Sequence, residues 1–189
     1  AGQLAELMKA QLAELNFLDV EFEIAVQRME EPGADGADDV EFLISTNPGE
    51  SLKPLGRIAS GGELSRVMLA IKTVLADQDA IETVIFDEID TGISGRTAQK
   101  VSEKLALIGR SRQVICITHL AQLASMADSH YCIEKRAVDG STQTGIRLLD
   151  EQESVEELAR ILGGAQITDA VIDNAREMKK LAQKFKERA

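Results

Sequence analysis

Three short motifs in a fixed order constrain this chain more than any other feature. The first is a Ser-Gly-Gly-Glu turn at 60–63 that opens a helical pattern. The second is an apolar run at 83–88 that ends in two acids, and the third is an apolar run at 114–119 that ends in Thr-His. Ligands of open α/β sheets bind outside the carboxyl ends of the parallel strands. The motifs therefore predict an α/β fold with a polar site at one sheet edge.

Apolar strands and helices alternate around these motifs. The alternation predicts a mainly parallel sheet that is covered by helices on both faces. The expected elements are a helix at 63–76, a strand at 82–87, a helix at 95–109, a strand at 113–118 and a short helix from Leu120.

The two ends of the chain follow other periods. Alternating apolar and polar residues predict an antiparallel hairpin, with strands at 20–29 and 40–46 around the turn-rich segment 31–36. A second hairpin, 129–136 with 144–149, is expected around Asp139-Gly140. Spacings of three and four predict a helix at 3–15. The remaining expected elements are a loop at 47–58 and helices at 153–162 and 167–187, which are separated by a stop at Gly163-Gly164.

Several of these elements have an expected apolar face. On the first hairpin the faces are Phe22, Ile24 and Val26 on one strand and Val40, Phe42 and Ile44 on the other. On the last helix the face is Val171, Met178, Leu181 and Phe185.

Composition limits the partners of the chain. The net charge of −11 repels phosphate backbones on average, so DNA contact requires a local basic patch or another part of a longer protein. The last helix carries basic residues that are candidates for such a patch, and a solvated helix face is the simpler interpretation. These residues are Lys179, Lys180, Lys184, Lys186 and Arg188.

The same composition indicates a cytoplasmic protein. No apolar run approaches the roughly 20 residues that cross a bilayer, and no secretory leader pattern is present. Cys116 and Cys132 provide neither a metal-ligand spacing nor a disulfide framework, which favours a reducing compartment. Cys116 lies within an apolar strand, and we expect a small buried side chain there. The chain enters a helical pattern directly after Ala1-Gly2, and we expect it to be a piece of a longer protein.

The glycine turn is suited to an anion. Glycines allow a close backbone approach, and the first N–H groups of a helix are free to bind a phosphate. On local chemistry alone, an ordinary helix N-cap explains the turn equally well.

The polar strand ends are suited to nucleotide chemistry. An acid such as Asp87 can hold Mg²⁺ through water, and a second acid such as Glu88 can deprotonate an attacking water. His119 can donate a hydrogen bond to a terminal phosphate. The alternatives are that the acids cap the following turn and that the histidine is structural.

In order and spacing, the motifs together resemble the ATP-binding-cassette (ABC) superfamily, and within it the coiled-coil, SMC-like ATPases of chromosome maintenance and DNA repair. The resemblance covers residues 10–185, the C-terminal half of an ATPase head. It is carried by four runs, at 59–66, 85–96, 118–120 and 157–164. The phosphate loop Gly-x-x-x-x-Gly-Lys-Ser/Thr is absent from all 189 residues, so the chain resembles half of an ATPase.

The resemblance implies roles for individual residues. Ser60, Gly61, Gly62 and Glu63 form the ABC signature, in which Ser60 and Gly62 would contact the γ-phosphate of ATP held by the opposite subunit. At the Walker B strand, Asp87 would hold Mg²⁺ and Glu88 would be the general base, with His119 as the switch histidine. Ser94 stands where related ATPases commonly carry an aspartate, with Asp90 nearby, so a direct acid-mediated link between two sites is in doubt.

The resemblance also implies an architecture. Residues 1–16 would be the end of an inserted coiled-coil arm, although an ordinary amphipathic helix fits them as well, and residues 17–189 would be the C-terminal lobe of the head. The implied cofactors are ATP and Mg²⁺. The implied partners are the N-terminal lobe of the same protein, a second head in an ATP-sandwich homodimer, and DNA through the full-length protein, with no membrane.

The resulting hypothesis is the head lobe of an ATP hydrolase that acts in DNA double-strand break repair and recombination. This chain alone is expected to be inactive because the phosphate loop is absent. A transporter nucleotide-binding domain shares the signature and both strand motifs, but the leucine-spaced helix before strand 20–29 suits an inserted coiled coil better. A nonenzymatic lobe that acts only by dimerisation is a third hypothesis, against which the presence of Glu88 argues.

Overall fold

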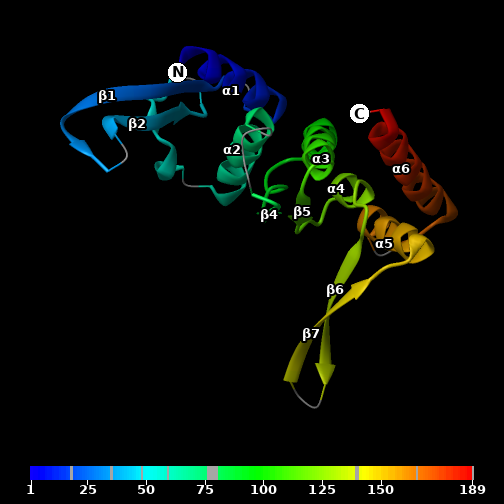
Figure 1. Cartoon of the computed structure of the whole chain (residues 1–189). Helices are drawn as coiled ribbons and strands as arrows, with labels where there is room; N and C mark the ends of the chain where they lie inside the picture. The colour runs from blue at the N-terminus through cyan, green and yellow to red at the C-terminus, as the bar shows by residue number, and fades with distance from the viewer. Residues whose placement is uncertain are drawn as a thin grey trace. The chain divides into compact units, whose positions relative to one another are not determined.

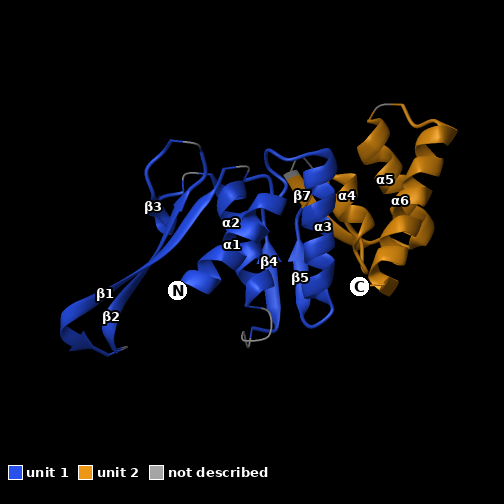
Figure 2. Ribbon diagram, turned by 90° about the horizontal axis from the view of Figure 1, so that it is seen from above, with its two compact units in different colours: residues 1–117 blue, residues 118–189 orange. Residues whose placement is uncertain are grey.

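A computed structural model shows that the chain divides into two compact units, residues 1–117 and 118–189 (Figure 2). The structure describes residues 1–17, 19–34, 36–47, 49–58, 60–75, 81–138, 141–164 and 166–188. Helices and strands alternate within it, which confirms the predicted α/β class (Figure 1).

A long antiparallel hairpin forms the first part of unit 1. Strand β1 (Glu21–Gly33) pairs with β2 (Gly36–Ser45), and the short strand β3 (Lys53–Pro54) adds to β2 before the 3₁₀ turn η1 (Leu55–Arg57). The strands reach further than the sequence indicated, so 31–36 is not simply a loop, although Asp35 lies outside the described residues. A register shift between Arg28 and Gly33 accommodates Pro32 in β1.

The predicted apolar face of this hairpin is only partly buried. Phe22 and its register partner Ile44 are buried, but Val26 and its partner Val40 are each more than half exposed. The prediction is therefore right at the base of the hairpin and wrong toward its tip. Alternation predicts which side chains share a face, but it does not show how far along the strands the covering elements extend.

Helix α1 (Gly2–Glu14), predicted at 3–15, packs against α2 (Gly61–Val74) and β1. Met8, Leu12 and Leu15 are fully buried. At its end, the buried Lys104 of α3 (Gly95–Gly109) pairs with Glu14 at 2.9 Å and donates a hydrogen bond to Gln11. A buried ammonium group needs such partners, so α1 and α3 are tied by a charged contact as well as by packing.

The predicted parallel pairing is formed by β4 (Thr83–Phe86) and β5 (Gln113–Cys116). In the described part of the chain, parallel pairing is confined to these two strands. The expectation that helices cover both faces is wrong here, because Ile85, Ile115 and Ile117 are 64%, 43% and 48% exposed.

Helix α2 begins two residues earlier than predicted because Ser60 caps it, and the predicted end at Ala76 lies outside the described residues.

Unit 2 begins with the short helix α4 (Ala121–Ser125) and the predicted second hairpin, β6 (Tyr131–Val138) paired with β7 (Ser141–Leu148). The expected turn at Asp139-Gly140 lies outside the described residues. Helix α5 (Glu151–Gly163) starts with a capping box, in which Asp150 and Glu153 each accept the other's backbone N–H. It ends at Gly164, whose φ of 59° lies in the left-handed region that glycine tolerates.

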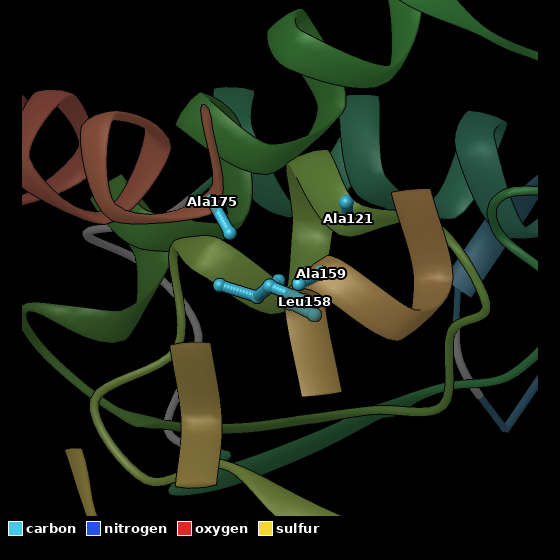
Figure 3. Close-up of a cluster of buried hydrophobic side chains, with 5 residues drawn as sticks. Ala121, Leu158, Ala159 and Ala175 are labelled. Carbon is cyan, nitrogen blue, oxygen red and sulfur yellow. The ribbon is translucent and has the colours of Figure 1, made fainter. Parts of the chain in front are cut away.

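Small side chains form the core of unit 2. Leu158 and Ala159 of α5 pack with Ala121 and Ala124 of α4 and Ala175 of α6 (Figure 3). Alanines at these contacts allow the helix backbones to approach closely, and Leu158 fills the space between them.

The buried stripe of α6 (Asp169–Arg188) differs from the prediction at one residue. Val171 and Met178 pack on the core as expected, together with Ala175, whereas Leu181 is 56% exposed and Ala182 is buried instead. Steps of three and four residues keep 171, 175, 178 and 182 on one stripe, and residue 181 falls beside it.

The candidate basic residues also lie on α6, where Lys186 pairs with Asp128 at 2.7 Å and Lys180, Lys184 and Arg188 are exposed.

Among the described residues, no helix is both long and apolar enough to cross a membrane.

Leu158→Ala should destabilise the chain by about 2–5 kcal/mol, because it leaves a cavity between α4, α5 and α6. The matched control is Leu162→Ala, one turn further along α5, where the side chain is 37% exposed. Chemical denaturation of the two variants measures the difference. Equal losses would contradict the assignment of Leu158 to the centre of this core.

Candidate nucleotide site

The signature turn begins as a helix N-cap. Ser60 Oγ accepts a hydrogen bond from Glu63 N at 3.4 Å, and Ser60 O accepts one from Leu64 N at 3.0 Å. The capping alternative is therefore correct as a description of local structure. It does not exclude an anion role, because the N–H groups of Gly61 and Gly62 also belong to the first helical turn, whose N–H groups have no partner within the helix.

Both glycines face the loop that follows β4. A Cβ atom on Gly62 would lie 2.9 Å from the carbonyl oxygen of Glu88 and 2.9 Å from Cβ of Thr91, which is closer than such atoms can approach. A Cβ atom on Gly61 would collide with Oε2 of Glu88. Gly62 is thus required within this chain by the close approach of α2 to the acidic loop, whereas Gly61 faces only the flexible end of the Glu88 side chain.

Two further side chains of α2 reach the same loop. Ser65 Oγ donates to the carbonyl of Asp87 at 2.8 Å, and Arg66 Nη1 donates to the carbonyls of Thr91 at 2.8 Å and Ile89 at 3.5 Å. Ser65, Arg66 and Thr91 were not among the predicted site residues. The sequence did contain one signal for a role of Arg66. It is a charged residue on the face of α2 that also carries the buried residues Gly62, Leu69 and Ala70.

The two acids of the predicted Walker B strand are exposed at the end of β4. Asp87 Oδ1 accepts the backbone N–H of Glu88 at 2.9 Å. Glu88 has a φ of 56°, in the left-handed region that costs a non-glycine residue free energy. The surrounding contacts with α2 hold this conformation, and both carboxylates remain accessible for other ligands.

The same edge contains Cys116, which is half-buried at the end of β5. Burial raises the pKa of its thiol to about 12, and the charges of Asp90 and Asp87 add to the effect. The thiol is therefore neutral at physiological pH and is a poor nucleophile. This agrees with the expected packing role of Cys116, although the side chain is less buried than predicted.

The remaining predicted site residues lie in two other places. Ser94 is the N-cap residue of α3, is exposed, and forms no side-chain cap bond. His119 belongs to unit 2, where it is exposed just before α4. The contacts within unit 1 bring the turn at 60–63 together with 87–91. The chemical roles of all the predicted site residues, Ser94 and His119 included, stay predictions.

Within the described ranges, no group of three or more His, Cys, Asp or Glu side chains could hold a metal ion. Asp87 and Glu88 can supply at most part of a coordination shell. This fits Mg²⁺, which keeps several waters and takes few protein carboxylates together with substrate phosphates.

Solved structures of SMC heads share this fold. The chain superimposes on an Smc head domain with a coiled coil and joint derived from Pyrococcus yayanosii with a TM-score of 0.56 and 21% identity, over 82% of this chain and 28% of that one. An Smc head with an extended coiled coil from Pyrococcus furiosus, bound to the C-terminal domain of ScpA, gives a TM-score of 0.51 and 20% identity over 85% and 37% of the two chains. The chain therefore has the fold of an SMC head domain.

Sequence relatives narrow the class. No family model matches the chain. The DNA repair protein RecN of Halalkalibacterium halodurans is 44% identical over 98% of this chain and 34% of its own length, and RecN of Bacillus subtilis is 50% identical over 80% and 26%. RecN of Deinococcus radiodurans is 44% identical over 94% and 31%. The chain belongs to the RecN family, and it spans about a third of the length of the curated relatives it matches.

Gly62→Ala should destabilise the chain by about 1–3 kcal/mol, because the new methyl group meets backbone and Thr91 atoms that cannot move independently. Gly61→Ala is the matched control, since the only atoms in its way belong to the flexible side chain of Glu88. Thermal unfolding should show a lower Tm for Gly62→Ala and little change for Gly61→Ala. An unchanged Tm in both variants would refute the close approach.

Proposed function

We propose that this chain is the C-terminal lobe of an ATP-binding and ATP-hydrolysing head, in a RecN protein that acts in DNA double-strand break repair through ATP-dependent head dimerisation. The observation that carries the proposal is the contact between the signature turn of α2 and the acidic loop after β4. Phosphate-binding amides and catalytic carboxylates thereby lie on one rigid support.

The residues of the signature turn and of the loop after β4 each have a proposed role. Asp87 holds Mg²⁺ through water, and Glu88 accepts the proton of the attacking water. Mg²⁺ bound with ATP would neutralise charge that develops on the phosphates. Ser60, Gly61, Gly62 and Glu63 receive the γ-phosphate of a nucleotide held by a second head.

Two residues outside this turn and loop also have proposed roles. Ser94 lies in the loop that crosses the dimer interface, and His119 is the switch histidine that donates to the terminal phosphate.

The described residues fit these ligands. The carboxylates of Asp87 and Glu88 are exposed, and so is Gly61 at the start of α2, where Oε2 of Glu88 lies beside it. The helix N-terminus adds a partial positive charge next to the first-turn N–H groups. A phosphate oxygen can therefore approach the turn without displacing a buried group.

The uncovered sheet supports a missing lobe as the first partner. Ile85 of β4, Ile115 of β5 and Ile117 just beyond β5 form an exposed apolar strip, although parallel strands are ordinarily buried on both faces. A two-stranded sheet is also too small to be stable alone. We propose that an N-terminal lobe covers this strip and supplies the phosphate loop that the sequence does not contain, while residues 1–16 end a coiled-coil arm.

The names of the relatives support DNA repair as the process. We propose further that the full-length protein contacts DNA, in the cytoplasm near the nucleoid. The RecN relatives favour this function over the transporter alternative.

Glu88→Gln in the complete head, meaning this chain joined to its phosphate-loop lobe, should slow ATP hydrolysis by about 10²–10⁴-fold, the usual contribution of a positioned general base. ATP binding should persist because glutamine keeps the shape and Asp87 remains. Steady-state turnover and equilibrium nucleotide binding measure the two effects.

The matched control is Glu82→Gln, an exposed acid at the opposite end of β4, which should leave turnover unchanged. This chain by itself should show no turnover. Hydrolysis by the isolated chain that is lost in Glu88→Gln would contradict the need for a second lobe.

Ser60→Arg should leave ATP binding to the monomeric head intact and abolish ATP-dependent dimerisation, because the turn faces a nucleotide held by the other head. Ser51→Arg, in an exposed loop, is the control for added charge and bulk. Light scattering with and without ATP reports dimerisation. If Ser60→Arg weakens ATP binding as much as loss of the phosphate loop does, the turn belongs to the pocket of its own head and the two-head proposal fails.

A further inference from the structure

Arg66 is a buried cation at the centre of unit 1. Arg66 is only 6% exposed, and its guanidinium lies 5.5 Å from the centre of the Phe17 ring. Burial lowers the pKa of Arg66, while the charge of Glu63 opposes that shift. Burying a guanidinium is costly unless its N–H groups find acceptors, so the positions of those acceptors indicate what the residue does.

The acceptors are backbone carbonyls of the loop after β4. Nη1 donates to Thr91 O at 2.8 Å and, more weakly, to Ile89 O at 3.5 Å. The buried Nε forms no hydrogen bond in the described part of the structure, so the side chain is held by Nη1 and by the Phe17 ring. These contacts fix the loop at the residues that follow the proposed base.

The loop itself is a series of tight turns. Thr91 N donates to Glu88 O at 3.0 Å, and Ile93 N donates to Asp90 O at 3.4 Å. Ile89 and Asp90 are buried, while Glu88 is held at positive φ. A change at the Thr91 carbonyl is therefore transmitted through one short turn to the backbone that orients the Glu88 carboxylate.

We propose that Arg66 is a positioning residue for ATP hydrolysis, which holds the Glu88–Thr91 turn in the conformation that directs Glu88 at its water. This inference rests on the proposed function. Phe17 is the second contact of the guanidinium, because this residue, in the segment that joins α1 to β1, places its ring centre 5.5 Å from it.

Lysine cannot replace Arg66 in this role. A guanidinium is planar, so it can lie on an aromatic ring while an edge N–H group donates to a carbonyl in its plane. An ammonium group lacks both the plane and the fork. Arg66→Lys therefore tests geometry at constant charge, and Arg66→Met tests loss of charge at similar length.

The kinetic test uses the complete head. Arg66→Met and Arg66→Lys should each lower kcat for ATP hydrolysis by about tenfold to a hundredfold, because a small displacement of a catalytic group has effects of this size. KM for ATP should change less than about twofold, since Arg66 belongs to no nucleotide contact. Phe17→Leu should give a smaller loss of kcat. The control is Arg57→Met, which removes an exposed arginine from η1.

A double-mutant comparison separates positioning from general damage. If Arg66 acts through Glu88, adding Arg66→Met to Glu88→Gln should cause no further loss of kcat. Independent, multiplying losses would overturn the proposal, as would an Arg66→Met kcat within twofold of the parent or a rise of KM that matches the fall of kcat.

Amide hydrogen exchange provides a readout that is independent of hydrolysis. In Arg66→Met, the Thr91 and Ile93 amides should exchange at least about tenfold faster, while amides in the middle of α3 keep their protection. Unchanged exchange at Thr91 and Ile93 overturns the role of Arg66. If the parent head hydrolyses no ATP, or Glu88→Gln has no effect, the proposed function fails instead, and the exchange result still decides whether Arg66 holds the turn.

Discussion

The close approach of α2 to the loop after β4 is the contact on which the candidate site depends. It exists because Gly62 has no Cβ atom where Glu88 O and Thr91 Cβ lie, and it is reinforced by hydrogen bonds from Ser65 and Arg66 to loop carbonyls. Steric necessity and hydrogen bonding act on the same few residues. The turn that we propose to bind phosphate and the two carboxylates are thereby held together, so movement of either displaces the other.

Two buried charges fix the arrangement of the helices around this contact. Arg66 joins α2 to the loop and to Phe17, and Lys104 joins α3 to the end of α1 through Glu14. Such groups are costly to bury and stabilise only the arrangement that satisfies them. The end of α1, the signature helix and the acidic loop are consequently tied in one network within unit 1. If residues 1–16 end a coiled-coil arm, that arm meets the head beside the loop that carries Glu88.

Local patterns predicted most elements, and long-range packing accounts for the errors. The glycine turn, the apolar runs and the stop at Gly163-Gly164 each depend on a few neighbouring residues, so α2, β4, β5, α5 and both hairpins could be predicted. The exposure of Val26, Ile85 and Leu181 could not, because burial depends on which elements cover a face. For the site, the motif spacing predicted that the turn at 60–63 and the acids at 87–88 belong together. It did not reveal that the glycines contact the loop of their own chain.

A crystal structure of the complete head with Mg²⁺ and a non-hydrolysable ATP analogue would test the proposed two-head site most directly. Two heads should enclose two nucleotides. Asp87 and Glu88 would face the nucleotide of their own head, Ser60–Gly62 would contact the γ-phosphate held by the other, and the Arg66 bond to the Thr91 carbonyl would be intact. A structure in which Ser60–Gly62 binds the nucleotide of its own head, or in which Glu88 points away from the γ-phosphate, would contradict it.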